Sequence, residues 1–307
     1  MPSRRYVIAS AIGLALTAAA GPALAQAEKL KVVASFSILG DLVKQVGGER
    51  LDITTLVGPN GDTHVYSPTP ADAKSLADAK LVFVNGLKFE GWMDRLVKSS
   101  GSKAALIVAT KGVKPLQAKD DHDHDHDHGG YDPHAFQDIG NVKLYVANIR
   151  DGLAAADPQG KATYEANATA YLKTLDGLET DVKAAIAKIP AANRKIITSH
   201  DAFGYFGKAY GMQFIAPKGV STEAEASAKD VARIIRQVKA EKIPAVFMEN
   251  IQDKRLAEQI ARETGAKIGG SLFSDALSPP DGPAGTYVDL MRNNIREFVS
   301  ALAPGGA

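Results

Sequence analysis

The 307-residue sequence contains no cysteine, which excludes disulfide bonds, cysteine zinc sites, thiol nucleophiles and a lipid-modified cysteine within it. It also lacks an excess of charge, because 36 Lys and Arg oppose 35 Asp and Glu. A near-neutral chain has no basic surplus with which to hold a phosphate backbone, so nucleic acid is not an expected partner. Aromatic residues make up only 7%, but 45% of the residues are hydrophobic, which is enough for a packed core.

Long apolar runs are equally scarce, and the one that stands out is residues 6–20. It follows Arg4 and Arg5 and precedes the segment GPALA, which ends at Ala25. A charged start, a short apolar stretch and an Ala-x-Ala ending predict a signal peptide over residues 1–25, cleaved after Ala25. We therefore expect a periplasmic product. The paired arginines also resemble a twin-arginine motif, which leaves the Sec and twin-arginine export routes open.

The rest of the sequence predicts an α/β fold, because short apolar segments alternate with amphipathic ones, a pattern typical of parallel sheets with covered faces. The segments expected in the first half are strands at 29–35, 51–57, 81–85 and 105–109 and helices at 41–46, 69–79 and 92–99. Those expected in the second half are strands at 195–198, 213–216, 245–248 and 267–269 and helices at 228–240 and 255–263. We therefore expect two lobes, over residues 26–156 and 190–307.

A long connector helix is expected between the lobes, over residues 157–189. Asp157 and Pro158 provide an acidic N-cap followed by proline at the first helical position. From Tyr164 to Ile189 the apolar residues keep helical spacing. A helix of about 31 residues would span roughly 46 Å, which is long enough to run along both lobes and to limit how far they hinge.

Four of the seven histidines lie in a His/Asp tract within residues 118–130. His122, His124, His126 and His128 alternate with aspartates, without an apolar residue that could join a core. We therefore expect a mobile loop. Alternating imidazole and carboxylate groups indicate a loose auxiliary zinc site, and the alternative is a solvated acidic loop with no function.

The other three histidines are isolated, which by itself is more typical of surface or core residues than of metal ligands. His64 and His134 lie in the turn-rich segments GPNGDTHVYSP and YDPHAFQD, and His200 directly follows an expected strand. Ligand sites of open α/β sheets collect at the carboxyl ends of strands, so these histidines could converge between the lobes. A fourth ligand would come from the second half. The spacing leaves four candidates open: Asp275, Glu223, Glu225 and Glu249.

Together these segments resemble the cluster A-I metal-binding proteins of ABC importers, the family that includes ZnuA, AztC and TroA. The resemblance covers nearly the whole mature sequence and is carried by GPNGDTHVYSPTPAD, the His/Asp tract, YDPHAFQD, IITSHDAFGYF, STEAEAS and SLFSDALS. It implies two (β/α) lobes joined by a rigid long helix, with a metal ion in the cleft between them. It also implies that the ligands are His64, His134, His200 and Asp275.

The resemblance further implies a monomer that is not an enzyme but captures Zn²⁺ and delivers it to the membrane permease of an ABC importer. A periplasmic zinc metallochaperone is a further implied partner. Three imidazoles and one carboxylate suit tetrahedral zinc, whereas manganese would prefer more oxygen ligands. Manganese-selective relatives tend to carry Glu where His200 stands.

Three alternatives stand beside this interpretation: a manganese-binding member of the family, a zinc hydrolase, and a zinc buffer or adhesin that works without a transporter. Against the hydrolase, four protein ligands leave no open position for water, and the sequence has no HExxH segment. Two residues depart from many relatives, Phe136 in place of Trp and Ala226 in place of Pro. We expect both to affect packing rather than metal binding.

Overall fold

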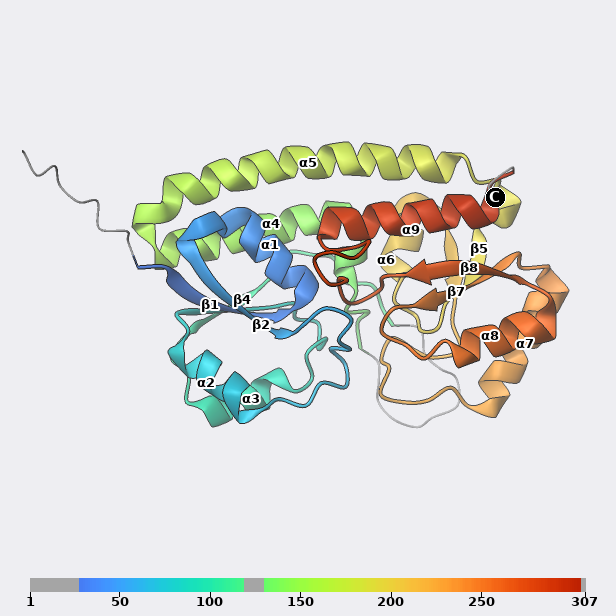
Figure 1. Ribbon diagram of the computed structural model, residues 1–307, viewed down its shortest axis with the longest axis horizontal. Helices are drawn as coiled ribbons and strands as arrows, with labels where there is room; N and C mark the ends of the chain where they lie inside the picture. Colours follow the sequence, from blue (N-terminus) through green and yellow to red (C-terminus); the bar gives the residue numbers. More distant parts are fainter. Residues whose placement is uncertain (1–27, 119–129, 305–307) are drawn as a thin grey trace, which may run out of the picture.

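The computed structural model describes residues 28–118 and 130–304, which form two lobes side by side along one long helix (Figure 1). The expected signal peptide over residues 1–25 lies outside the described residues. So does the His/Asp tract from 119 to 129. Among the described helices, none combines the length and the apolar character needed to cross a membrane.

The N-terminal lobe is built on a parallel four-stranded sheet. Its strands are β1 (Leu30–Phe36), β2 (Leu51–Val57), β3 (Leu81–Val84) and β4 (Ala105–Val108), in the order β2-β1-β3-β4. Its first helices are α1 (Ser37–Gly47), α2 (Pro70–Asp78) and α3 (Met93–Ser100). Strand β1 is central because its run of small and apolar residues is buried from Val32 to Phe36. Helix α2 begins where expected, because Thr69 and Asp72 form a reciprocal capping box.

The C-terminal lobe repeats this plan. Its strands are β5 (Lys195–Ile197), β6 (Gln213–Ile215), β7 (Ala245–Glu249) and β8 (Lys267–Leu272), in the parallel order β6-β5-β7-β8. Its helices are α6 (Gly204–Tyr210), α7 (Ala228–Glu241), α8 (Arg255–Thr264) and α9 (Tyr287–Leu302). The expected fold class of two α/β lobes with parallel sheets is confirmed, and every expected strand is present.

The connector differs from the expected single helix over 157–189. It divides into a 3₁₀ turn, η3 (Pro158–Gly160), and the helix α5 (Lys161–Ala187). Asp157 fixes the turn, because its carboxylate accepts hydrogen bonds from the Gly160 N–H and the Tyr164 hydroxyl. A helix that the sequence analysis did not predict, α4 (Ile139–Ala156), precedes the turn and packs against α5.

Helix α5 is therefore one member of a layer of three helices that spans both lobes (Figure 1). Helix α4 packs against α5 on the side of the N-terminal lobe. Helix α9, also not predicted, packs against it on the side of the C-terminal lobe. One cluster of buried apolar residues extends across this layer and includes Phe36, Tyr145, Leu175 and Phe298. The lobes therefore share a core as well as a connector, which opposes wide hinge motion.

We expect replacement of Leu175 by Ala to lower the free energy of unfolding by about 2–5 kcal/mol, because the side chain is completely buried in this shared core. Both lobes should still unfold in one transition. Urea unfolding followed by far-UV circular dichroism and by fluorescence of the only tryptophan, Trp92 in the N-terminal lobe, measures both quantities. Lys173→Ala on the exposed face is the control, expected within about 0.5 kcal/mol of wild type. Two separate transitions would contradict a shared core.

Candidate metal centre

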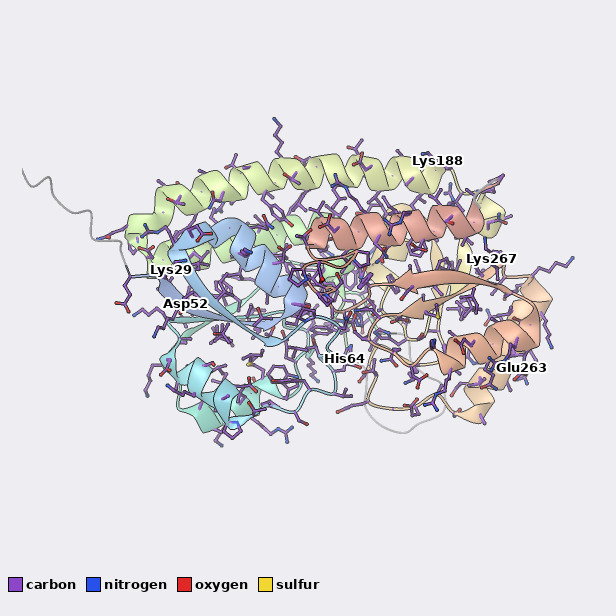
Figure 2. The ribbon with its side chains drawn as sticks, in the orientation of Figure 1. Lys29, Asp52, His64, Lys188, Glu263 and Lys267 are labelled. Atoms are coloured by element: carbon purple, nitrogen blue, oxygen red, sulfur yellow. The ribbon has the colours of Figure 1, made fainter. Side chains whose placement is uncertain are left out.

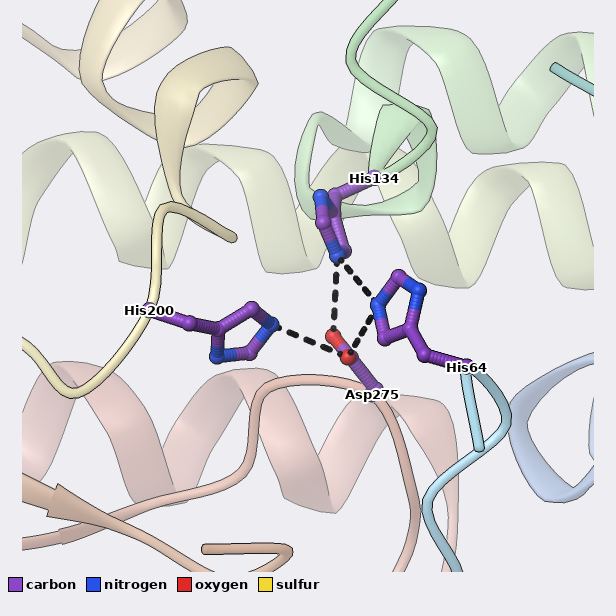
Figure 3. Close-up of side chains that lie close together, drawn as sticks. All are labelled: His64, His134, His200 and Asp275. Atoms are coloured by element: carbon purple, nitrogen blue, oxygen red, sulfur yellow. Dashed lines mark hydrogen bonds and ion pairs between the residues drawn. The ribbon is translucent and has the colours of Figure 1, made fainter. Parts of the chain in front are cut away.

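The structure brings His64, His134, His200 and Asp275 together (Figure 3). His64 lies where the two lobes meet (Figure 2). One potential ligand atom of each lies within 4.8 Å of those of the other three. The Nε2 atoms of His64 and His200 lie 3.2 and 3.1 Å from Asp275 Oδ2, and Nε2 of His134 lies 3.5 Å from Asp275 Oδ1. Three of the side chains are completely buried, and that of His64 is 5% exposed.

Each of the four side chains comes from a different loop. His64 lies in the loop after β2, and His134 immediately precedes the 3₁₀ turn η2 (Ala135–Gln137) that leads into α4. His200 follows β5 and Asp275 follows β8. The two lobes therefore contribute two side chains each, and those of His200 and Asp275 come shortly after the ends of parallel strands.

The fourth position, which the spacing left open, is filled by Asp275. Glu249 lies on the far side of the His200 ring, with Oε2 2.5 Å from Nδ1, and not in the centre. Glu223 and Glu225 are exposed, and Glu225 forms an ion pair with Lys218. The loop histidines His122, His124, His126 and His128 lie outside the described residues.

A carboxylate supports the backbone of each of the three histidines. Each histidine donates its backbone N–H to a carboxylate oxygen. The pairs are His64 with Asp62 at 3.0 Å, His134 with Asp132 at 2.9 Å, and His200 with Glu249 at 3.0 Å. The sequence analysis did not identify these acceptors. The Asp-x-His spacing of Asp62 and Asp132 was a signal for two of them, because a short acidic side chain readily accepts from the backbone two residues on.

Asp132 also fixes the ring of His134. Its Oδ1 lies 2.8 Å from His134 Nδ1. Because a carboxylate only accepts, Nδ1 carries a proton, and Nε2 is the nitrogen that faces the centre. Glu249 is close to His200 Nδ1 but not aligned with it, so neither atom has a hydrogen-bond partner among the described residues.

The donor set fits a metal ion. Oδ1 of Asp275 is buried without a hydrogen-bond partner in the described part of the chain. Such an atom is costly unless a cation satisfies it. Three imidazole nitrogens and one carboxylate within a few ångströms are the ligand types that divalent transition metals bind.

Comparison with known proteins identifies the family. Residues 32–301 match the family model described as "ZnuA: Zinc-uptake complex component A periplasmic". The chain belongs to the ZnuA family. It is a periplasmic metal-binding protein of the ABC-transporter substrate-binding class.

Relatives within the ZnuA family carry names that refer to different metals. The "Manganese-binding lipoprotein MntA" of Halalkalibacterium halodurans is 36% identical over 277 residues, which cover 90% of this chain and 89% of the relative. The "Iron-binding protein YfeA" of Yersinia pestis is 32% identical, with 88% and 85% covered.

Solved structures of the ZnuA family share the two-lobed fold. A manganese-bound periplasmic metal binding protein from Candidatus Liberibacter asiaticus has a TM-score of 0.79 and 31% identity, with 89% of this chain and 98% of that chain covered. The periplasmic zinc binding protein TroA from Treponema pallidum has a TM-score of 0.82 and 29% identity, with 90% of this chain and 100% of that chain covered.

Of the two residues that the sequence analysis singled out as departures from many relatives, Phe136 is completely buried. Its ring packs against those of Phe36 and Phe89 at centroid distances of 5.4 and 5.5 Å. The ring of His134 lies 5.9 Å from it, edge to face. Phe136 therefore forms part of the apolar wall behind the centre, whereas the other departure, Ala226, is only partly buried.

The carboxylates also control protonation of this ZnuA-family centre when no metal is bound. Burial acts to lower the pKa of His134, but Asp275 and Asp132 outweigh it and raise this pKa to about 9. Burial is likewise outweighed at His200, where Glu249 and Asp275 raise the pKa well above its usual value.

His64 and Asp275 complete the charge balance. Burial lowers the pKa of His64, which has no carboxylate behind its ring, so this histidine is neutral at pH 7. Burial acts to raise the pKa of Asp275, but His134 and His200 reverse this and hold it well below its usual value. The metal-free centre therefore contains one carboxylate and two protonated imidazoles.

We expect zinc binding at pH 7 to expel about two protons, because metal displaces them from His134 and His200. Affinity should therefore fall on acidification and rise with pH at least to about 9, the pKa of His134. Calorimetric titration in two buffers of different ionisation enthalpy gives the number of protons released. Binding without proton release between pH 7 and 8 would contradict this protonation state.

Proposed function

We propose that this chain is a periplasmic zinc-binding protein that captures Zn²⁺ between its lobes and delivers it to the membrane permease of an ABC importer. The proposed ligands are His64, His134, His200 and Asp275. The observation that carries the proposal is the convergence of three imidazole Nε2 atoms on one buried carboxylate. Nitrogen-rich four-ligand sets of this kind favour tetrahedral zinc.

Manganese is the second candidate, and one observation favours it. Oδ1 of Asp275 has no hydrogen-bond partner among the described residues, so both oxygens of this carboxylate could bind one ion. A two-oxygen contact would raise the coordination number towards what manganese prefers. Manganese is also named in the descriptions of MntA and of the Liberibacter structure.

The geometry argues against the zinc hydrolase considered from the sequence. Catalytic zinc keeps an open position for water and needs a base within reach of it. Here four side chains surround the centre, and the carboxylates of Asp132 and Glu249 lie behind histidine rings.

For the rest of the chain, we propose export through the predicted signal peptide with cleavage after Ala25, and action as a monomer. A periplasmic zinc metallochaperone is the proposed source of metal in addition to free ions. We propose His122, His124, His126 and His128 as an auxiliary, weaker zinc site. The domain limits proposed are residues 26–156, 157–189 and 190–307.

We expect single replacement of His64, His134, His200 or Asp275 by Ala to weaken zinc binding at least about 100-fold, since each change removes a quarter of the ligand set. Competition with a chromogenic chelator measures the affinity. Asp281→Ala, an exposed carboxylate in the loop after Asp275, is the control and should bind as wild type. If any two of the four variants bind within a few-fold of wild type, the ligand assignment is wrong.

The same titrations decide between the metals. Because an added carboxylate favours manganese, His200→Glu should narrow the preference for zinc over manganese by at least about tenfold. An unchanged preference in this variant, together with manganese in protein purified without added metal, would favour the manganese alternative.

We expect replacement of residues 119–129 by a short turn to remove the weaker zinc equivalents and to keep the tight one. The ends of this segment already meet, because the Ala118 N–H donates to the Gly130 carbonyl at 3.0 Å and Gln117 pairs with Tyr131. Zinc stoichiometry by calorimetry is the measurement. Loss of the tight equivalent would mean that the segment supplies a ligand to the centre.

A further inference from the structure

The loop that carries His64 is bound directly to the opposite lobe. Asp62 connects the two. Its Oδ1 accepts the backbone N–H of His64 at 3.0 Å. Its Oδ2 accepts the Thr222 hydroxyl at 2.7 Å and the Gln252 side-chain amide at 3.2 Å. Thr222 lies between β6 and α7, and Gln252 follows β7, so both belong to the C-terminal lobe.

This arrangement distinguishes His64 from the other two histidines. Asp132 holds His134 from within the same segment of chain. Glu249 holds His200 from within the same lobe. In both pairs the carboxylate faces the imidazole as well as the backbone. Asp62 instead accepts hydrogen bonds from the opposite lobe with its second carboxylate oxygen. The support of His64 therefore depends on how the two lobes are placed relative to each other.

The partners of Asp62 are themselves held in place. Thr222 is only 7% exposed. The side-chain oxygen of Gln252 accepts from Lys218 at 3.1 Å, which fixes which end of the amide faces Asp62. Lys218 in turn pairs with Glu225 at 2.9 Å. The C-terminal lobe thus presents two oriented donors to one carboxylate oxygen.

A second attachment lies two residues before Asp62. The Asn60 N–H donates to the Leu277 carbonyl at 2.9 Å, and the Asn60 side chain accepts from Asn250 at 3.0 Å. Asn60 has a left-handed backbone conformation, with φ of 56°, which Asn tolerates better than most residues. The loop is therefore hydrogen-bonded to the C-terminal lobe at two positions, Asn60 and Asp62.

We propose that Asp62, Thr222 and Gln252 are positioning residues that form an interlobe latch, which holds His64 at the metal only while the lobes are together. This inference rests on the proposed metal-binding function. Separation of the lobes removes His64 first, because His134 and His200 keep their own supports. Three ligands hold the ion more weakly than four, so the latch sets how long the metal stays bound.

Thr222→Val tests the latch, since valine keeps the shape of threonine and removes the hydroxyl that donates to Asp62. We expect zinc to dissociate about tenfold faster, as measured by stopped-flow mixing of loaded protein with excess chelator. Ser221→Ala is the matched control. It also removes a hydroxyl, from the neighbouring residue, but one that accepts only from the Glu223 N–H of its own loop in the described structure. Its rate should stay within twofold of wild type.

A double-mutant cycle shows whether Thr222 acts through Asp62. In the Asp62→Ala background the Thr222→Val change should have no further effect on the dissociation rate, because its acceptor is gone. A rate for Thr222→Val equal to that of Ser221→Ala overturns the latch. So does an acceleration by Thr222→Val that persists undiminished in the Asp62→Ala background.

Amide hydrogen exchange of the metal-free proteins separates this inference from the proposed function. With no metal present, Thr222→Val should raise exchange at residues 60–65, and Ser221→Ala should leave it unchanged. If the wild type failed to bind zinc tightly, the proposed function would fail, and this exchange difference would still decide for or against the latch. Equal exchange in the two variants would overturn it.

Discussion

The buried carboxylate of Asp275 is the constraint on which the rest of the centre depends. A single negative charge in the interior is costly unless a positive charge lies beside it. In the absence of metal, two protonated imidazoles supply the positive charge beside Asp275. A bound divalent ion would supply it in their place. The carboxylates behind His134 and His200 make the exchange possible because they stabilise the protonated rings. Asp132 also orients the ring of His134, so that its Nε2 faces the centre. Proton and metal therefore compete for one set of lone pairs.

Around this centre, the rigid and the adjustable parts of the molecule are separated. Helices α4, α5 and α9 and their shared apolar core tie the lobes together along one side. The four candidate ligands lie on loops and not on these helices. Opening therefore has to come from small tilts and from loops such as the one that carries His64, since the helix layer resists a large rotation.

The strands could be predicted because each is a short apolar run bounded by polar turns. Helices α4 and α9 were missed although both have apolar residues at helical spacing, as at Val142, Tyr145, Val146 and Ile149. Their packing against α5 joins distant segments and has no local signal. The three histidines could be predicted from their loops. Spacing could not choose Asp275 over Glu249, because Glu249 ends one strand and Asp275 follows another. The family resemblance named Asp275, and the folded geometry places this carboxylate beside the three histidines.

The single tryptophan has a further consequence. Trp92 is buried at the start of α3, and its indole N–H donates to the carbonyl of Thr63 at 2.8 Å, next to His64. Any displacement of that loop changes the hydrogen bonding and the solvent contact of the only indole in the chain. The protein thus contains its own optical reporter: without any attached dye, Trp92 emission follows the position of the loop that carries His64.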